Sequence, residues 1–100
     1  MLLILRSARA ARDLDEMWDY IPDIAGVARA DIFLERLGKR MNMLAEFPDM
    51  GYRCEELAPG LRGLTLSDYI VFYRRRENII EIARVLHGAR DTQSLFKDGE

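Results

Sequence analysis

The sequence predicts a single α+β domain in the order strand, helix, helix, strand, strand, strand, with a short helix after the last strand. In the first half, apolar residues recur at intervals of three and four, which is typical of helices; in the second half they alternate, which is typical of strands. The chain has 100 residues, 49% of them hydrophobic, which suffices for one core and one domain spanning residues 1–100. We therefore expect a helical hairpin packed on a small antiparallel sheet.

The first elements are a short strand and an amphipathic helix. Residues 2–5 are an unbroken apolar run, which predicts a buried strand. Ser7 follows at a position where its hydroxyl can cap a helix. Pro22 is expected to end that helix, because proline lacks a backbone N–H. The apolar face of the helix, which we expect to be buried against the sheet, comprises Ala8, Ala11, Leu14, Met17, Trp18 and Ile21.

A second helix is predicted from about Ile24 or Val27 to Glu46, before Pro48. Gly38 lies inside it and lowers helix propensity, so we expect it to mark close packing against the first helix. Two consecutive amphipathic helices with a short joint predict an antiparallel hairpin. The apolar face of this second helix comprises Val27, Ala30, Leu34, Leu37, Met41 and Leu44, widened by Phe33 and Ala45.

The second half is predicted to be a loop followed by a three-stranded meander. One face of the resulting sheet is expected to pack on the helices, and the other face is expected to remain open for a partner. The expected segments are a loop at 49–60, strands at 61–66, 69–73 and 79–86 with turns at 67–68 and 74–78, a terminal helix at 89–96 and a frayed tail at 97–100.

Charge and composition exclude some classes of function. The net charge is −2, which argues against a general nucleic-acid binder. Thirteen of the 15 basic residues are arginine, whose planar guanidinium suits carboxylate or phosphate; codon preference explains the excess equally well. Cys54 is the only cysteine, so neither an internal disulfide nor a cysteine zinc site is expected. We expect a cytoplasmic protein with no metal, no cofactor and no membrane segment.

The sequence contains few groups for catalysis. His87 is the only histidine, and neither a GxSxG elbow nor a phosphate-binding loop accompanies it. Strand alternation places Arg84 with Ile80, Ile82 and Leu86, so Arg84 needs a partner, for which Asp91 is the candidate. What remains is a cluster of basic groups on the predicted sheet, comprising Arg62, Arg74, Arg75, Arg76, Arg84, His87 and Arg90.

Each of these basic groups has a purely structural alternative. Arg84 fits a structural ion pair as well as it fits a binding surface. Residues 74–76 fit a solvated turn, and His87 fits a strand-end side chain with one hydrogen bond. The sequence leaves these alternatives open.

Five segments, taken in order, resemble the ParE branch of the RelE/ParE toxins, the toxic halves of bacterial type II toxin–antitoxin pairs. The resemblance extends over about residues 3–96, and the fold of that family, a helical hairpin on an antiparallel sheet, agrees with the predicted order. The five segments are Trp-Asp-Tyr-Ile at 18–21, Leu-Ala-Glu-Phe-Pro-Asp-Met-Gly at 44–51, Pro-Gly-Leu-Arg at 59–62, Tyr-Ile-Val-Phe-Tyr-Arg at 69–74 and Arg-Val-Leu-His-Gly-Ala-Arg-Asp at 84–91.

The resemblance implies one of two targets. RelE-like members cut messenger RNA on the ribosome, whereas ParE-like members are thought to poison DNA gyrase. Ile70 stands where the RelE type has an arginine, and Phe96 stands about where it has a tyrosine. Neither side chain can neutralise phosphate or transfer a proton. We therefore expect a gyrase poison with no catalytic residues. If the protein is instead a ribosome-dependent nuclease, its candidate residues are Arg62, Arg84, His87 and Arg90.

A third alternative is a non-toxic module that only binds its antitoxin. All three alternatives imply a ParD-like antitoxin encoded next to this protein, forming a hetero-oligomer with it through helix-in-groove and strand-addition contacts. The predicted target-binding residues are Arg62, Arg74, Arg84, His87, Arg90 and Asp91. The predicted antitoxin-binding residues, to the extent that they are not core, are Leu14, Met17, Trp18, Ile21, Phe33, Leu37 and Met41.

Overall fold

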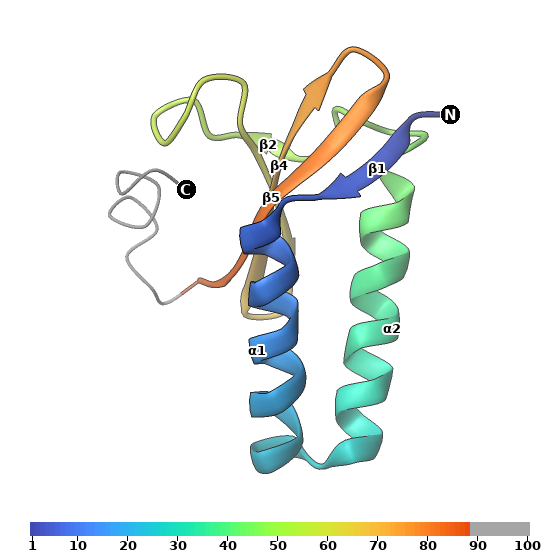
Figure 1. Ribbon diagram of the computed structural model, residues 1–100, viewed down its shortest axis with the longest axis vertical. Helices are drawn as coiled ribbons and strands as arrows, with labels where there is room; N and C mark the ends of the chain where they lie inside the picture. The colour runs from blue at the N-terminus through green and yellow to red at the C-terminus, as the bar shows by residue number, and fades with distance from the viewer. Residues whose placement is uncertain (89–100) are drawn as a thin grey trace.

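A computed structural model describes residues 1–88, except for the side chains of residues 20–25 and 27. It shows two helices packed on one sheet (Figure 1). The predicted helix at 89–96 and the predicted frayed tail lie outside the described residues. The elements, in chain order, are β1 (Leu3–Arg6), α1 (Ala8–Ala25), α2 (Val27–Met43), β2 (Tyr52–Arg53), β3 (Arg62–Leu66), β4 (Tyr69–Arg76) and β5 (Ile79–His87).

The sheet has five strands in the order β1-β5-β4-β3-β2. β3, β4 and β5 form the predicted antiparallel meander. β1 pairs in parallel with β5, so the sheet is mixed rather than antiparallel. β1 is also an edge strand, and Leu3 is 60% exposed, so the prediction of a buried first strand was wrong. β2 is a two-residue strand inside the predicted loop.

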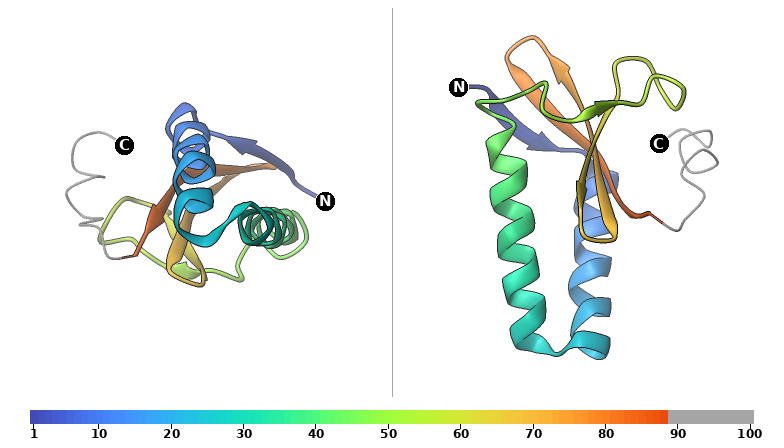
Figure 2. Two further views of the ribbon diagram at one scale, coloured as in Figure 1. Left: turned by 90° about the horizontal axis from the view of Figure 1, so that it is seen from below. Right: turned by 180° about the vertical axis from the view of Figure 1, so that it is seen from behind.

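The helices form the predicted hairpin and lie side by side (Figure 2). Ser7 caps α1 as expected, since its Oγ accepts a hydrogen bond from the N–H of Ala10 at 3.0 Å. α1 continues past Pro22 to Ala25, so the predicted stop at Pro22 was wrong. The φ of proline suits helical backbone, and one missing donor does not end the helix. Gly26, at φ 88, makes the joint between the helices.

The buried face of α1 is rotated from the predicted one. Ala10, Asp13 and Met17 are buried, with Asp13 6% exposed. Ala8 and Ala11 are exposed instead. Because Asp13 is charged, the apolar pattern alone assigned it to solvent, and this error shifted the predicted face.

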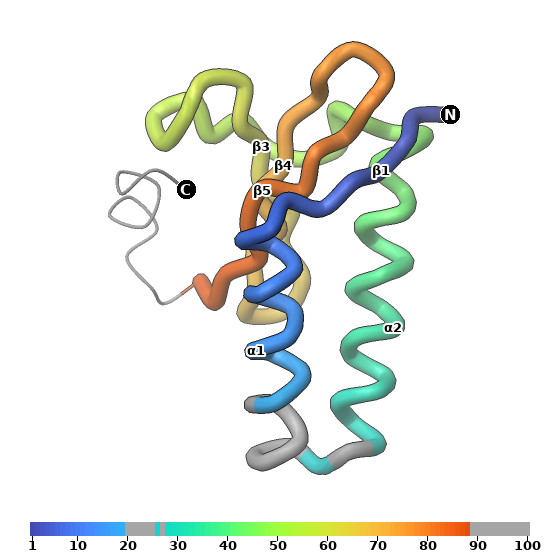
Figure 3. The backbone as a smooth tube through the Cα atoms, viewed as in Figure 1, coloured from blue at the N-terminus to red at the C-terminus, as the bar shows by residue number. Residues whose placement is uncertain are grey.

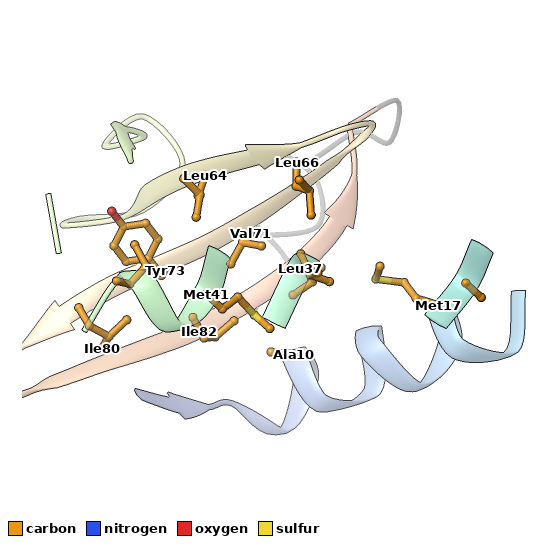
Figure 4. Close-up of a cluster of buried hydrophobic side chains, with 13 residues drawn as sticks. Ala10, Met17, Leu37, Met41, Leu64, Leu66, Val71, Tyr73, Ile80 and Ile82 are labelled. Carbon is orange, nitrogen blue, oxygen red and sulfur yellow. The ribbon is translucent and has the colours of Figure 1, made fainter. Parts of the chain in front are cut away.

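The main core lies between the helices and the inner face of the sheet (Figure 4). Gly38 of α2 does not contribute close packing, since a Cβ added there would meet nothing within 4 Å; the prediction for Gly38 was wrong. The buried members of this core are Ala10, Met17, Ala30, Leu37, Met41, Leu44, Leu64, Leu66, Val71, Tyr73, Ile80, Ile82 and Val85.

The outer face of the sheet carries a smaller core, so the expectation that this face is open was wrong. Its buried members are Cys54, Leu61, Phe72, Ala83 and Leu86. The loop of residues 54–61 packs Leu57 and Ala58 against them. The Cys54 N–H closes this loop by donating to the Leu61 carbonyl at 2.8 Å. Figure 3 traces the chain from the end of α2 through this loop into β3.

No helix in the described part of the chain combines the length and the apolar composition needed to cross a membrane.

Candidate functional site

Arg84, predicted to contact a target, lies in the interior instead. Its Nε and Nη2 donate to the Asp13 carboxylate of α1 at 2.8 and 3.0 Å. The N–H of Val85 donates to the same carboxylate at 3.0 Å. The two side chains are only 4% and 7% exposed. This burial contradicts the predicted place of Arg84 on the surface, and the partner that the structure shows for it is Asp13. Asp91, the partner predicted from the sequence, lies outside the described residues.

A β-bulge explains why strand alternation misplaced the neighbours of Arg84. Tyr73 pairs with Ile82 and Phe72 pairs with Arg84, so Ala83 is an extra residue in β5. The extra residue reverses the alternation beyond it. Val85 therefore faces the main core, whereas Leu86 joins Ala83 on the outer face. The predicted grouping of Leu86 with Ile80 and Ile82 was wrong for this reason.

Ser7 completes the junction between α1 and β5. Its hydroxyl donates to the carbonyl of Ala83 at 2.8 Å while it caps α1. The backbone N–H of Ser7 donates to the carbonyl of Ile82 at 2.9 Å. We call Ser7, Asp13, Ala83, Arg84 and Val85 the α1–β5 junction. It joins the start of the first helix to the bulged strand through four side-chain hydrogen bonds to β5.

Arg62 stabilises a loop at the other end of the sheet. Its Nη1 donates to the carbonyl of Gly51 at 2.7 Å, and its Nη2 lies 3.7 Å from the Asp49 carboxylate. The hydroxyl of Tyr73 donates to the carbonyl of Pro48 at 2.8 Å and accepts from the N–H of Gly51 at 2.9 Å. We call Tyr73 and these loop contacts the Tyr73 anchor. Arg62 thus supports a loop, although its side chain remains 24% exposed.

Two of the groups in this region have raised pKa values. Burial is the main cause that raises the pKa of Tyr73, and the N–H of Gly51 and the charge of Arg62 act in the opposite direction. Burial, and then the charge of Glu56, raises the pKa of the Cys54 thiol. Both shifts favour the neutral form. The thiol of Cys54 is therefore a packed core group rather than an activated nucleophile.

The end of the β4–β5 hairpin presents arginines at the surface. Arg74 is only 16% exposed at its side chain and lies 3.9 Å from Glu81. Arg76 is 61% exposed and lies 3.7 Å from the same carboxylate. Arg75 is also exposed, and its Nε donates to the carbonyl of Glu77 at 3.2 Å. Within the predicted basic cluster, Arg75 and Arg76 are the most accessible groups in the described part of the chain, whereas the side chain of Arg74, which was predicted to contact a target, is largely covered.

His87 lies at the opposite end of β5 from these arginines. Its ring meets Tyr69 edge-on at 5.2 Å, and Tyr69 in turn lies 5.4 Å from Phe33 of α2. These three rings link strands β4 and β5 of the sheet to helix α2. The structure therefore separates the predicted cluster: Arg84 is inside, Arg62 and Arg74 lie near one end, His87 lies at the other, and Arg90 falls outside the described residues.

The predicted antitoxin-binding residues divide by exposure. Trp18 is 53% exposed, so the expectation that the sheet buries it was wrong. Leu14 and Phe33 are half-buried against the main core. The side chain of Ile21 lies outside the described residues. The remaining three, Met17, Leu37 and Met41, are buried between the helices and the sheet.

Asp13 is the site residue that the sequence reasoning missed. It follows Ala10 by three positions and precedes Met17 by four, so it occupies the buried face at helical spacing. A carboxylate at such a position needs a cationic partner, and Arg84 is the one arginine on a mostly apolar strand. Matching the carboxylate on the buried face of the helix with the arginine on the buried strand would have predicted the Asp13–Arg84 contact.

Among the described residues, no three His, Cys, Asp or Glu side chains are grouped so that they could hold a metal ion. The arrangement instead offers accessible charge at the hairpin end and an accessible indole on α1. Both are features of binding surfaces.

Comparison with known proteins gives a consistent result. Residues 4–92 match the family model described as ParE toxin of type II toxin-antitoxin system, parDE. A curated relative named Toxin ParE1 from Mycobacterium tuberculosis is 36% identical over 88 residues, covering 87% of this chain and 90% of the relative. A Toxin ParE1 from Caulobacter vibrioides is also 36% identical over 88 residues, covering 88% and 91%.

A solved structure supports the same fold. A chain from the chromosomal ParDE TA system from P. aeruginosa matches with a TM-score of 0.75, covering 87% of this chain and 96% of that one. The two sequences are 24% identical.

Proposed function

From the premise that this chain belongs to the ParE toxin family of type II toxin–antitoxin systems, we propose that it inhibits DNA gyrase and that a ParD-like antitoxin encoded next to it neutralises it. The family match over residues 4–92 carries the proposal. An action on gyrase also implies a cytoplasmic location, because that is where the bacterial chromosome is supercoiled.

The buried Arg84 favours gyrase over the ribosome-dependent alternative. A nuclease built on Arg62, Arg84, His87 and Arg90 needs these groups around one scissile phosphate. The Arg84 side chain is instead 4% exposed and paired with Asp13 of α1. Ile70, on the middle strand, is half-buried beside the outer core and offers no charge. The described residues of that candidate set do not converge on one phosphate.

The direct test adds purified protein to a gyrase supercoiling reaction. We expect loss of supercoiling and accumulation of cleaved DNA at stoichiometric amounts, both prevented when the antitoxin is added first. Preincubation with the antitoxin is the matched control, because it removes the toxin without changing the enzyme. Normal supercoiling at a large excess of toxin would overturn the proposal.

Translating ribosomes provide the complementary experiment. On the proposed function, toeprinting shows no toxin-dependent cuts in the ribosomal A site. Cuts that appear with the wild type and vanish in His87→Ala would assign the chain to the nuclease alternative. Induced expression without any effect on growth would instead indicate a module that only binds the antitoxin.

The proposal also places antitoxin contacts on the helical hairpin. Trp18 is a large aromatic exposed over 53% of its surface, and tryptophan is frequent among residues that dominate binding energy. In a pull-down titration with the neighbouring gene product, we expect Trp18→Ala to weaken binding by about 30-fold, or roughly 2 kcal/mol. Ile32→Ala is the matched control, because Ile32 is a similarly exposed apolar residue of α2, at 60%, and is not among the predicted antitoxin-binding residues. Equal losses in both variants would contradict this placement.

A further inference from the structure

The two edges of the sheet differ in how far they are covered. At the β3 side, the two-residue strand β2 pairs with Arg62 and Gly63. Beyond β2, the Nη2 of Arg40 from α2 donates to the carbonyl of Thr65 in β3 at 3.3 Å. The opposite edge is β1, which has β5 on one side and none of the described strands on the other. β1 is therefore the edge at which the sheet can still accept a strand.

The backbone of β1 directs alternate residues toward that open side. The N–H groups of Leu3 and Ser7 donate to backbone carbonyls on the β5 side, at 3.1 and 2.9 Å. In a parallel pair, the residues between such donors turn their own N–H and C=O groups away from the neighbouring strand. In β1 these residues are Ile4 and Arg6. Their backbone groups are the ones available to a further strand.

The side chains of β1 make this edge apolar. Leu3 is 60% exposed and Leu5 is 46% exposed, whereas Ile4 between them packs against the main core. The strand contains no proline and no lysine, and its one charged residue, Arg6, is its last. Its pairing with β5 also runs without a bulge. These are the devices that commonly protect an edge from pairing with another chain, and β1 carries only the arginine.

A second copy of β1 complements this edge in one antiparallel register. When Ile4 of one copy faces Arg6 of the other, each outward-facing residue exchanges its N–H and C=O with its opposite residue. The twofold axis then passes through Leu5. The two Leu5 side chains face each other at a non-hydrogen-bonded position, where Cα atoms lie only about 4.5 Å apart.

The neighbouring symmetric registers are less favourable. A pairing centred on Arg6 places two guanidinium groups directly opposite each other, which is destabilising. A pairing centred on Ile4 requires the N–H of Leu2, which already donates to the carbonyl of Ala45 at 3.0 Å. Only the register centred on Leu5 uses every outward-facing group and sets no charge opposite a like charge.

We infer that free copies of this protein pair through β1 into a twofold dimer centred on Leu5, which joins two sheets into one. A second copy is favoured as the occupant because it brings the same exposed leucines in register. The contact is smaller than the roughly 1,200–2,000 Å² of stable complexes. We therefore expect a weak dimer, with a Kd of roughly ten to a hundred micromolar. The inference is independent of the proposed action on gyrase.

Disulfide cross-linking of two single variants tests the register. Leu5→Cys sets two thiols opposite each other, at a separation that suits a disulfide, whereas Leu3→Cys sets each thiol opposite Ser7 of the second copy. Under mild oxidation we expect covalent dimers of Leu5→Cys to form at least about tenfold faster than those of Leu3→Cys. The native Cys54 is 2% exposed and stays out of the reaction. Random collision favours Leu3→Cys, the more exposed site, so equal rates would overturn the inference.

Sedimentation velocity of the purified protein tests the dimer itself. Between about 1 and about 300 µM, the wild type should shift from monomer toward dimer. Leu5→Lys and Leu5→Glu should each remain monomeric, because like charges then face each other, and an equimolar mixture of the two should dimerise again. Ile32→Lys is the matched control, since Ile32 is an exposed apolar residue of α2, and it should dimerise as the wild type does.

Thermal unfolding checks that each variant is folded. A wild type that stays monomeric at the highest concentration would overturn the inference, and so would a mixture of Leu5→Lys and Leu5→Glu that fails to associate. If the wild type is monomeric and Leu5→Lys instead weakens binding of the neighbouring gene product, the edge accepts a strand of the antitoxin, and pairing between copies is excluded.

Discussion

The α1–β5 junction and the Tyr73 anchor perform similar tasks with different chemistry. Each ties a segment outside the sheet to the sheet through a buried polar group. The junction uses the charged pair Asp13 and Arg84, 7% and 4% exposed. The anchor uses the neutral hydroxyl of Tyr73, which both donates and accepts.

The two regions show that a polar group, charged or neutral, can be buried where its hydrogen-bond partners are buried with it. Each group is tolerated because its partners are within about 3.0 Å. The difference lies in what remains after one partner is removed. An uncompensated buried charge costs more than an unpaired neutral group. The following predictions test that ranking.

Asp13→Ala should have the largest effect. It leaves the buried guanidinium of Arg84 without its carboxylate, so we expect a loss of about 3–5 kcal/mol in the free energy of unfolding. Equilibrium urea denaturation measures this loss.

The double variant Asp13→Leu/Arg84→Met sharpens the result. It removes both charges and leaves mainly the Val85 N–H unpaired, so its loss should be only about 1–3 kcal/mol. A double variant less stable than Asp13→Ala would contradict the interpretation of a buried charge. It would show that the contacts themselves carry the stability.

Gly51→Ala should come second, because the anchor leaves no room for a side chain. A Cβ there would lie 2.6 Å from the Gly63 carbonyl oxygen and 2.7 Å from the Tyr73 ring. We expect a loss of about 1–3 kcal/mol, as in other overpacked sites, measured by thermal unfolding. Gly38→Ala is the control, since that position is open and should gain up to about 1 kcal/mol of helix propensity. Losses of equal size at both glycines would exclude the steric explanation.

Tyr73→Phe should cost less, about 1–2 kcal/mol, because it leaves neutral groups of Pro48 and Gly51 unpaired. Hydrogen exchange at the Gly51 amide should speed up, since its acceptor is lost. Unchanged exchange at Gly51 with reduced global stability would mean that the ring, rather than the hydroxyl, holds the loop.

The smallest effect concerns alkaline pH. The pKa of Tyr73 is raised above its ordinary value of 10.0, so the folded state retains the phenolic proton more tightly than the unfolded chain. That contribution to stability is complete below about pH 10 and is lost as the pH rises through the folded-state pKa. Between about pH 9 and pH 11, unfolding free energy should fall less steeply for Tyr73→Phe than for the wild type. If unfolding free energy has the same pH dependence in both proteins, ionisation of Tyr73 does not contribute to the loss of stability at alkaline pH.

Local pattern was enough to predict much of the fold. The meander follows from alternation and its two tight turns, and the helical hairpin follows from apolar spacing. The Ser7 cap follows from its hydroxyl standing just before the helix. Each of these signals lies within a few residues of the feature it predicts, which is why the sequence alone shows it.

The missed features depend on contacts distant in sequence. The Asp13–Arg84 pair joins positions 71 apart, and the bulge at Ala83 changes which residues share a face without altering composition. The covered outer face depends on how the loop of residues 54–61 returns over the sheet. Of the candidate site, the sequence identified the arginine-rich hairpin end but included Arg84, because residue type does not report whether an arginine is paired inside.

The segments that carry the family resemblance include many structural residues. Gly51 has no space for a side chain, Tyr73 anchors the loop, and Arg62 bonds to it. Such residues report the shared architecture rather than the target. This explains why the resemblance predicted the fold more fully than it predicted the surface that contacts the target.

The Ser7 hydroxyl makes two hydrogen bonds, one within the start of α1 and one to β5, and this limits when the protein can finish folding during synthesis. The Ser7 hydroxyl that caps α1 also donates to the carbonyl of Ala83 in β5, and β1 pairs with β5, the last strand of the described residues. During synthesis the N-terminal segments therefore have no finished partner until β5 has left the ribosome. A shortened nascent chain that lacks β5 cannot complete the fold, so a ribosome that stalls early releases a fragment without the assembled surfaces of the toxin.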